Sequence, residues 1–549
     1  MFSALNKSTY LIGFFLILAL QPNPSSAQAL KPLGSPTAPA GGTFYLLLNA
    51  EPSTLNPFSG ATDAYSNDVR GYIHESLMNR DIETYGWAPA LAERYETSKD
   101  GMSFTFYMRK DAVFADGKPV TADDVKFSYD AIFDPAYKAA VLQPYYENFS
   151  SVEVIDANTV KFNVKKKYFK NFEVAAGLTV LPKHVYGDKS KKMNKEVMGS
   201  GPYVLEKYDQ GRSIILTKNQ KWWGSKVPYY AGYYKAEKIH MRIIREDSVA
   251  LETLKRGELD YKGLSPEDYF LKTKGEPWGT KVLKKQYENS APRSTPFIGW
   301  NNKNIIFKDR EVRLAMTHLY NREEMAKKFF FGVAKPATGP WYQQSPTANP
   351  KTKAISYDPK KAKEILAKAG WSDSDKNGVL DKIIDGKKKE FRFTLLNPNK
   401  DYEKYFTVYK EELKKAGIDM SISNIDWNAF QKKMDEKEFE ALFLVWGGTV
   451  DGDPKQIWHS ASSVKGGSNF ISYKNEKVDQ LIDKAREELN DKKRRPMMQE
   501  IYDLVAQDVP YTFLINTTAS FYGYNSRMKM VQPTYKYGVG VDTWWISNK

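Results

Sequence analysis

The stretch FRFTLLNPNKDYEKYFTVYKEELKKAGIDMSISNI, residues 391–425, indicates the fold class. It opens with a compact apolar run over Phe391–Leu396, which is typical of a buried strand. Met420–Ile425 at its end is a second strand of the same kind. Between them, apolar side chains recur at helical spacing up to a terminating glycine, at Tyr405, Phe406, Tyr409, Leu413 and Gly417. This order predicts a β-α-β unit, and with it an α/β fold that contains a parallel sheet.

Strand and helix signals continue on both sides of this unit. Helix signals are frequent in the second half of the chain, where Asp309 and Asp358 are good N-caps and Pro359 suits the first helical position. Strand signals are frequent in the first half, where compact or alternating apolar residues occupy Thr43–Asn49, Ser103–Met108, Tyr203–Tyr208 and Ser213–Thr217. The chain therefore mixes strands and helices throughout.

Length and composition limit the classes of protein to consider. At about 150 residues per domain, the 549 residues suggest three or four domain-sized units. The chain has no cysteine, which excludes a disulfide framework, thiolate metal sites and a cysteine nucleophile. Aromatic residues make up 14% of the chain, which argues against disorder. Such a surplus fits either a large binding surface or a large core.

The N-terminus has the pattern of a secretory signal peptide. Lys7 precedes an apolar run over Tyr10–Leu20, which is shorter than the roughly 20 residues of a membrane span. Small residues around Ala27 predict cleavage after that residue, and residues 28–42 form a Pro/Gly/Ala linker. An uncleaved anchor is the alternative. Because no cysteine follows the run, a lipid anchor is not expected, and the mature chain is expected to be exported and soluble.

Catalytic signatures are missing from the sequence. The five histidines are isolated from one another, and none has the spacing of a metal ligand. The nucleophile elbow, the Walker loop and the dinucleotide fingerprint do not occur. We therefore expect no enzyme and no cofactor.

One acidic loop is a weak calcium candidate. Asp373, Asp375, Asn377 and Asp381 match ligand positions of a calcium loop. Position 12 is Ile384, however, where such loops carry a bidentate glutamate. A solvated turn between a helix and a strand is the simpler interpretation.

The positive charge does not point to nucleic acid. The 81 basic and 66 acidic residues give a formal net charge of +15. The lysine clusters, such as residues 165–167, 387–389 and 492–495, are spread over the chain rather than gathered in one arm. They are typical of solvated faces, so no nucleic-acid partner is expected.

Several segments together resemble a known family. They are residues 51–57 (EPSTLNP), 75–77 (ESL), 89–93 (PALAE), 103–109 (SFTFYMR), 114–125 (FADGKPVTADDV), 199–203 (GSGPY) and 219–224 (NQKWWG), and the capped helix that starts at Asp309. In this combination the chain resembles the extracellular solute-binding proteins of ABC transporters, family 5, which is the peptide- and nickel-binding class. The resemblance covers essentially the whole mature chain.

The resemblance implies a two-lobed α/β fold of the periplasmic binding-protein type, class II, with an extra subdomain. Lobe I would span residues 43–297, with an inserted subdomain at about 71–198. Lobe II would span residues 298–513, and residues 514–549 would return to lobe I. The two crossings would form a hinge that includes Pro296, Gly299, Leu514 and Asn516.

The same resemblance implies a function. A peptide or peptide-like solute would bind as an extended strand between the lobes, held by main-chain hydrogen bonds. The closed, monomeric receptor would then dock on an ABC permease in the inner membrane, and it would be periplasmic. Two alternatives stay open, namely an exported enzyme that acts on cell-wall or peptide substrates, and a receptor of the same fold for a non-peptide solute.

The residues expected to determine ligand specificity differ from the pattern of the family. Peptide receptors carry an aspartate for the ligand's amine shortly after a tryptophan that ends a strand, whereas here Val450 stands at that position. Either Asp451 or Asp453 takes its place, or the ligand lacks a free amine there, or both acids form a solvated turn. The ligand-binding residues that the resemblance implies are Glu51, Trp341, Trp446, Gly447, Gly448, Asp451, Asp453, Asn469 and Phe470.

Overall fold

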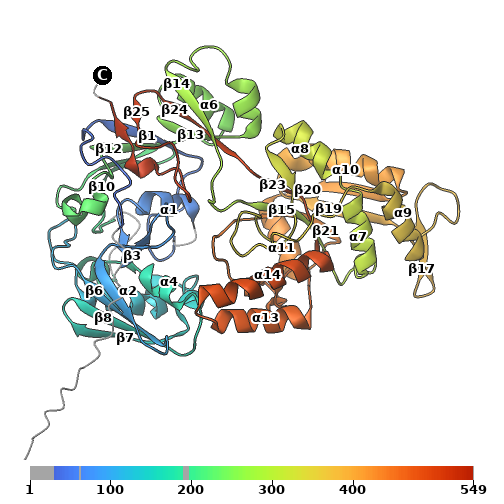
Figure 1. Ribbon diagram of the computed structural model, residues 1–549, viewed down its shortest axis with the longest axis horizontal. Coiled ribbons are helices and arrows are strands. Elements are labelled where there is room, and N and C mark those ends of the chain that lie inside the picture. The colour runs from blue at the N-terminus through green and yellow to red at the C-terminus, as the bar shows by residue number, and fades with distance from the viewer. Residues whose placement is uncertain (1–29, 61–62, 190–196, 548–549) are drawn as a thin grey trace, which may run out of the picture.

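The computed structural model describes residues 30–60, 63–189 and 197–547, and these form two lobes side by side (Figure 1). The first half of the chain and its C-terminal end build the lobe at the left of Figure 1, which we call lobe I. The residues between them build the lobe at the right, which we call lobe II. The predicted cleavage site at Ala27 lies outside the described residues.

Lobe I contains two sheets next to each other. The first has the strand order β1 (Thr43–Leu48), β12 (Lys238–Ile243), β11 (Ser213–Lys218) and β10 (Tyr203–Asp209), with β1 parallel to β12. The helix α1 (Ala64–Arg70) packs on it through Val69. The second has the order β13 (Tyr261–Leu264), β24 (Ser520–Asn525) and β14 (Val282–Tyr287), beside α6 (Asp247–Lys255). Because β24 comes from the end of the chain, lobe I is discontinuous in sequence.

A third sheet of lobe I lies within the predicted subdomain. Its order is β5 (Ala92–Thr97), β6 (Ser103–Met108), β8 (Thr159–Val164) and β7 (Phe149–Asp156), and α2 (Ala122–Phe133) packs against it. Phe104, Phe106 and Met108 are buried while their neighbours are half-buried, which confirms the predicted alternation. Shorter elements here are β2 (Glu75–Ser76), β3 (Met78–Arg80), β4 (Trp87–Pro89), α3 (Gln143–Tyr146), α4 (Asn171–Ala176), β9 (Thr179–Val180) and α5 (Lys183–Tyr186).

Lobe II is built around one five-stranded sheet. Its order is β20 (Asp419–Asn424), β19 (Arg392–Asn397), β21 (Ala441–Trp446), β15 (Thr295–Trp300) and β22 (Tyr511–Phe513). The strands β19 and β20 are parallel and joined by α10 (Glu403–Lys415), which confirms the β-α-β unit. The expectation of a parallel sheet holds only for β20, β19 and β21, because β15 runs antiparallel to both of its neighbours. The sheet is therefore mixed.

Helices surround this sheet, and two of their predicted starts are confirmed. Asp309 accepts a hydrogen bond from the Glu311 N–H, and Asp358 accepts one from the Lys361 N–H. The helices are α7 (Arg310–His318), α8 (Arg322–Phe330), α9 (Pro359–Lys368), α11 (Trp427–Glu436), α12 (Lys455–Trp458), α13 (Glu476–Glu487) and α14 (Asp491–Asp508). Short strands complete the chain, namely β16 (Ala334–Pro336), β17 (Asp381–Ile384), β18 (Lys387–Glu390), β23 (Ile515–Thr517), β25 (Met528–Lys529) and β26 (Trp545–Ile546).

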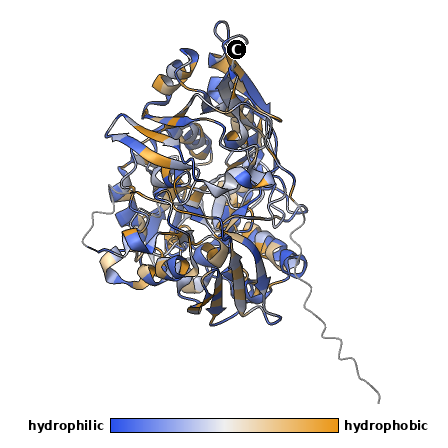
Figure 2. Ribbon diagram, turned by 90° about the vertical axis from the view of Figure 1, so that its left-hand side faces the viewer, coloured by the Kyte–Doolittle hydropathy of each residue, from blue (hydrophilic) through white to orange (hydrophobic). Residues whose placement is uncertain are grey.

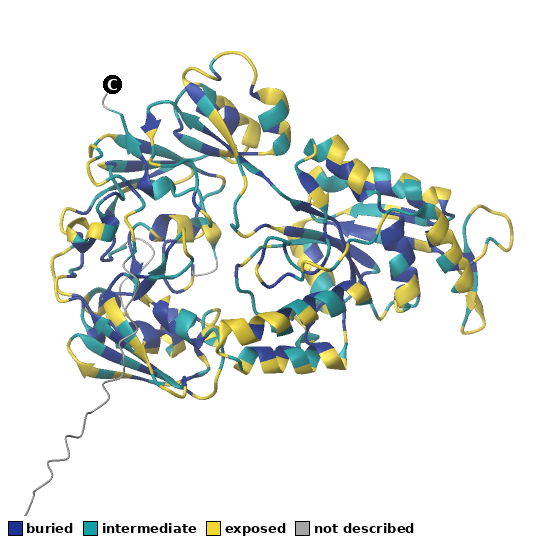
Figure 3. Cartoon of the chain, in the orientation of Figure 1, coloured by how far each residue is buried: buried dark blue, intermediate teal, exposed yellow. Residues whose placement is uncertain are grey.

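Burial follows this layout. The sheet strands of lobe II are largely dark in Figure 3, whereas α13 and α14 show exposed residues on their outer faces and the β17–β18 hairpin projects into solvent. Hydrophobic and hydrophilic residues alternate along most elements (Figure 2). Within residues 30–60, 63–189 and 197–547, no helix combines the length and the apolar character that crossing a bilayer requires.

The chain passes between the lobes twice. The first passage lies in residues 288–294, between β14 of lobe I and β15 of lobe II. The second follows β23, which pairs with β16, and precedes β24. The predicted hinge residues lie next to these passages, with Pro296 and Gly299 inside β15, Leu514 just before β23 and Asn516 inside it. Their role as a hinge stays a prediction.

A buried glutamate ties β2 to a distant segment of lobe I. The Glu75 carboxylate accepts hydrogen bonds from the indole N–H groups of Trp222 (2.8 Å) and Trp223 (2.7 Å). Burial raises the pKa of Glu75 to about 7, and these two bonds only partly offset the loss of hydration. The folded protein therefore holds a proton at Glu75 more tightly than the unfolded chain does.

We expect the substitution Glu75→Gln to change how stability depends on pH. The raised pKa contributes stability that is complete below the ordinary value of 4.5 and is lost as pH rises through about 7. Relative to Glu75→Gln, which cannot ionise, the wild-type protein should lose about 3 kcal/mol of unfolding free energy across this range. Urea unfolding of both proteins at several pH values measures the difference.

The control is Glu93→Gln, whose side chain is 59% exposed in the same lobe. The unfolding free energy of this variant should depend on pH in the same way as that of the wild type. A Glu75→Gln profile that also runs parallel to that of the wild type would show that burial does not raise the pKa of this carboxyl.

Candidate functional site

The loop after β21 lies against the first passage between the lobes. Trp446 ends β21 opposite Thr295 of β15, and its ring stacks on Phe297 with the centroids 6.0 Å apart. Two residues later, a Cβ atom at Gly448 would lie 2.4 Å from the carbonyl oxygen of Arg293. Only a glycine allows this approach. The loop of residues 447–454 is therefore held next to the chain that connects the lobes.

Residues 341–345 join this loop from the side of lobe II. The Ser345 hydroxyl donates a hydrogen bond to the Val450 carbonyl (3.4 Å), and the Gln343 N–H donates one to the Asn516 side chain (3.1 Å). The ring of Trp341 packs edge-on against Tyr502 of α14 with a centroid distance of 5.1 Å. Residues 341–345, the loop of residues 447–454 and Arg293 thus form one connected group, which we call the interlobe group.

Polar atoms of the interlobe group are buried without partners. Within the described part of the chain, six side-chain atoms of this group are shielded from solvent and make no hydrogen bond: Arg293 Nε, Trp341 Nε1, the Tyr342 hydroxyl, Gln343 Oε1, Gln344 Oε1 and Asp451 Oδ1. Leaving such atoms unpaired costs about 1–3 kcal/mol each. The set includes both donors and acceptors, so it suits a ligand that offers both.

The two acids of the loop are paired with arginines of lobe II. Asp451 Oδ2 lies 3.1 Å from the Arg494 guanidinium, and burial raises the pKa of Asp451. Asp453 Oδ2 accepts from Arg486 Nε (2.9 Å), and its Oδ1 accepts from the Lys455 N–H (3.0 Å). Because the two carboxylate side chains are 24% and 16% exposed, they do not form a solvated turn. Whether either touches a ligand amine stays a prediction.

Asp453 also joins the two lobes. The Tyr168 hydroxyl of lobe I donates to Asp453 Oδ2 (2.8 Å), and the Phe169 N–H donates to the Arg486 carbonyl (2.9 Å). The guanidinium of Arg486 lies over the Tyr168 ring at 4.4 Å, and that of Arg494 lies over the Phe169 ring at 4.4 Å. We call this set the Tyr168 contact, and in Figure 1 it falls where α4 approaches α13 and α14. It links the lobes away from the two chain passages.

The other predicted ligand residues have different surroundings from the two acids. Gly447 faces open space. Phe470 is buried in the lobe II core against Trp446 and Phe297, and Asn469 holds the main chain of Tyr473 and His459 together. Glu51 accepts from the Tyr208 hydroxyl (3.0 Å) and the Gly211 N–H (2.9 Å), which are bonds within lobe I. As ligand contacts, all of these residues stay predictions.

The sequence analysis missed Tyr168, Arg293, Arg486 and Arg494. Tyr168 lies 285 positions before its partner Asp453. No local motif marks either residue, because the pairing exists only once both lobes are folded. A cluster of aromatic and basic residues at 165–170 was the only available signal.

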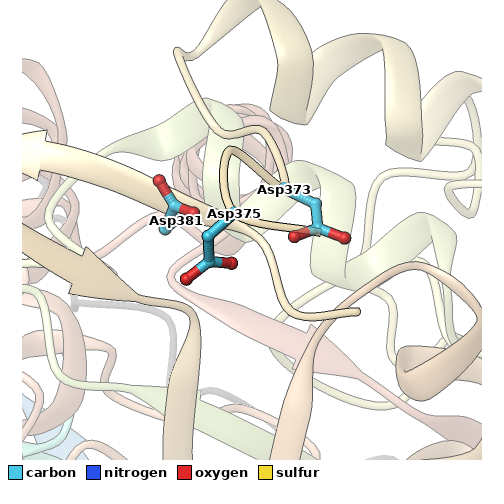
Figure 4. Close-up of side chains that lie close together, drawn as sticks. All are labelled: Asp373, Asp375 and Asp381. Carbon is cyan, nitrogen blue, oxygen red and sulfur yellow. The ribbon is translucent and has the colours of Figure 1, made fainter. Parts of the chain in front are cut away.

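A lysine side chain pairs with the acidic loop of lobe II. Asp373, Asp375 and Asp381 bring ligand atoms within 4.8 Å of one another (Figure 4). The Lys388 ammonium lies 2.5 Å from Asp375 and 3.4 Å from Asp381, and the Ser374 hydroxyl and N–H bind Asp381. Asn377 donates to Glu390 (2.7 Å). The calcium site stays a prediction, and calcium would have to displace Lys388.

Comparison with known proteins agrees with this architecture. The family model for bacterial extracellular solute-binding proteins, family 5, middle part, matches residues 86–469. The oligopeptide-binding protein AppA of Bacillus subtilis is 30% identical over 98% of this chain and 97% of its own length.

Solved structures show the same two-lobed α/β fold. The structure of AppA from Bacillus subtilis with a nonapeptide has a TM-score of 0.75 and 28% identity, and the match covers 93% of this chain and 100% of that one. NikZ from Campylobacter jejuni, solved with Ni(L-His), has a TM-score of 0.75 at 24% identity and shows the fold over 91% of this chain and 99% of that one. The chain therefore belongs to the family 5 bacterial extracellular solute-binding proteins.

Proposed function

We propose that this protein is the substrate-binding receptor of an ABC importer and captures peptides or peptide-like solutes between its lobes. The unpaired donors and acceptors of the interlobe group carry this proposal. An extended peptide offers an N–H and a C=O at almost every residue, so its main chain can satisfy both kinds of atom whatever its side chains are. The relation to AppA, which was solved with a nonapeptide, supports the same ligand class.

Closure of the lobes is the second part of the proposal. Only a ligand that binds the closed state more tightly than the open state can drive closure. The Tyr168 contact stabilises the closed arrangement because it joins lobe I to Asp453 and Arg486 of lobe II. The two chain passages, with Pro296, Gly299, Leu514 and Asn516 beside them, would act as the hinge.

The remaining parts follow from the family. The protein would be exported, released from its signal peptide after Ala27, and active as a periplasmic monomer. It would deliver its solute chemically unchanged to a permease in the inner membrane. A non-peptide solute is the alternative within the fold, because the structure of NikZ was solved with Ni(L-His).

Native mass spectrometry of protein purified without unfolding tests the ligand class. We expect a series of co-purified peptide masses. Adding a peptide mixture to ligand-free protein should raise the unfolding free energy by about 2.7 kcal/mol at 100 times Kd, because peptide binds only the folded state. A single non-peptide mass, or a peptide cleaved at a rate that a point mutation abolishes, would contradict the proposal.

The substitution Tyr168→Phe tests the role of closure. It removes a hydrogen bond to an ionised carboxylate, which is worth about 1.5–3 kcal/mol. If that bond forms on closure, peptide affinity should fall about tenfold or more, since 1.4 kcal/mol is tenfold in Kd. Calorimetric titration with a co-purified peptide measures the change, and small-angle scattering measures the compaction on binding.

Tyr107→Phe is the matched control. The Tyr107 hydroxyl donates to Glu96 Oε2 (3.0 Å) within the β5–β6 pair, away from lobe II. This variant should bind peptide as the wild type does. Equal affinities of the Tyr168→Phe and Tyr107→Phe variants would show that the Tyr168 contact does not contribute to ligand capture.

A further inference from the structure

Lobe I contains a cavity of about 670 Å³ that is separate from the interlobe group. Its walls come from residues 57–58 and from parts of the segments 67–82, 128–181, 202–234 and 540–542, all of them in lobe I. Pockets that hold small molecules usually have volumes of about 300–1,000 Å³. The cavity is therefore large enough for a ligand group of its own.

Two carboxylates in the wall form no ion pair among the described residues. Asp542 Oδ1 accepts from the Tyr72 hydroxyl (2.8 Å), and Glu75 accepts from two indole N–H groups. Among the described residues, neither carboxylate lies within ion-pair distance of a lysine, arginine or histidine. Burial raises the pKa of both, which reports the cost of keeping a charge there.

The basic side chains in the wall are committed elsewhere. Arg70 donates to the carbonyls of Ser66 (3.3 Å) and Gly60 (2.9 Å). Arg80 pairs with Glu173 (2.6 Å) and lies over the Trp87 ring at 3.7 Å. Burial lowers the pKa of His74 to about 3, so its ring is neutral at physiological pH. None of these groups pairs with Asp542 or Glu75, although the charge of Arg109, whose guanidinium lies over the Trp223 ring at 4.4 Å, partly offsets the effect of burial on Glu75.

Aromatic rings fill much of the remaining wall. Trp222 and Tyr234 lie with their ring centroids 5.3 Å apart, and Tyr230 and Tyr233 lie 5.6 Å apart. Trp222 also donates to Glu75, so the rings and the carboxylate belong to one cluster. Tyr234 has a φ of +52°, a strained conformation for a residue that is not glycine. Such strain persists where surrounding contacts fix a residue, often at binding sites.

We propose that this cavity binds an organic cation, an ammonium or guanidinium group, with Asp542 and Glu75 as its counter-charges and the aromatic rings around it. Buried carboxylates and aromatic faces both attract such a group. An anionic group would face two carboxylates instead. The cation is either a side chain of a captured peptide, which rests on the proposed function, or a separate small amine, which does not.

Calorimetric titration of the mature protein with cadaverine, a diamine, tests the proposal against 1-pentanol, a neutral probe of similar length. Cadaverine should bind at least about tenfold more tightly than 1-pentanol. Asp542→Asn should weaken cadaverine binding by about tenfold or more, while its amide oxygen still accepts from Tyr72. Equal affinities for the two probes would overturn the proposal.

The matched control is Asp130→Asn, which removes an exposed carboxylate of α2 that pairs with Lys126. It should bind cadaverine as the wild type does, and a loss equal to that of Asp542→Asn would overturn the proposal. If Asp542→Asn does not fold, Glu75→Gln takes its place, with the same expected loss and the same overturning result.

Peptides separate this proposal from the proposed function. Trilysine should lose affinity on Asp542→Asn while trialanine should not, if the cation is a peptide side chain. If Asp542→Asn weakens the binding of cadaverine but not of trilysine, the cation is a separate small amine. Either result supports the cavity proposal. Trialanine binding without any cadaverine binding would leave the receptor function intact and overturn the cavity proposal. Cadaverine binding without any peptide binding would support the cavity proposal and overturn the receptor function.

Discussion

The strand β15 is the constraint on which lobe II and its contact with lobe I depend. Phe297, Ile298 and Trp300 are fully buried, because β15 lies inside the sheet with β21 on one side and β22 on the other. It is also the first element after the chain leaves lobe I, so a largely buried strand of one lobe is tied directly to the other. The register that sets Thr295 opposite Trp446 then brings the loop of residues 447–454 against Arg293. The place where a ligand would bind is thus determined by strand pairing.

Local patterns in the sequence were enough for the elements but not for their pairing. The unit at residues 391–425 was predictable because apolar spacing distinguishes a strand from a helix, and the caps at Asp309 and Asp358 because their side chains act within one turn. The antiparallel direction of β15 could not be predicted, because the strands that pair with it begin at Ala441 and Tyr511, far along the chain. The resemblance singled out the loop after Trp446, whose contact with a ligand stays a prediction. It could not locate Tyr168, whose partner Asp453 lies in the other lobe.

The pairing of the loop acids changes how amine recognition has to be viewed. From the sequence, Asp451 and Asp453 were candidates for a free ligand amine. In the folded protein they face Arg494 and Arg486, and Asp453 also accepts from Tyr168. An amine would have to compete with a largely buried guanidinium, and removing one partner of such a pair costs about 3–5 kcal/mol. Recognition of the ligand's main chain would avoid that cost, because it would use the unpaired atoms of the interlobe group instead of the paired acids.

Buried acids have different partners in the lobe I cavity and at the boundary between the lobes. At the boundary each acid of the loop has an arginine, so its charge is compensated within the protein. In the cavity, Asp542 accepts a hydrogen bond from a phenol and Glu75 accepts two from indoles, and these donors are neutral. Neutral donors fix the direction of a carboxylate but leave its charge uncompensated in a medium of low polarity. The arrangement therefore orients two acids toward a space that an added cation would suit, because burial makes an isolated negative charge there costly.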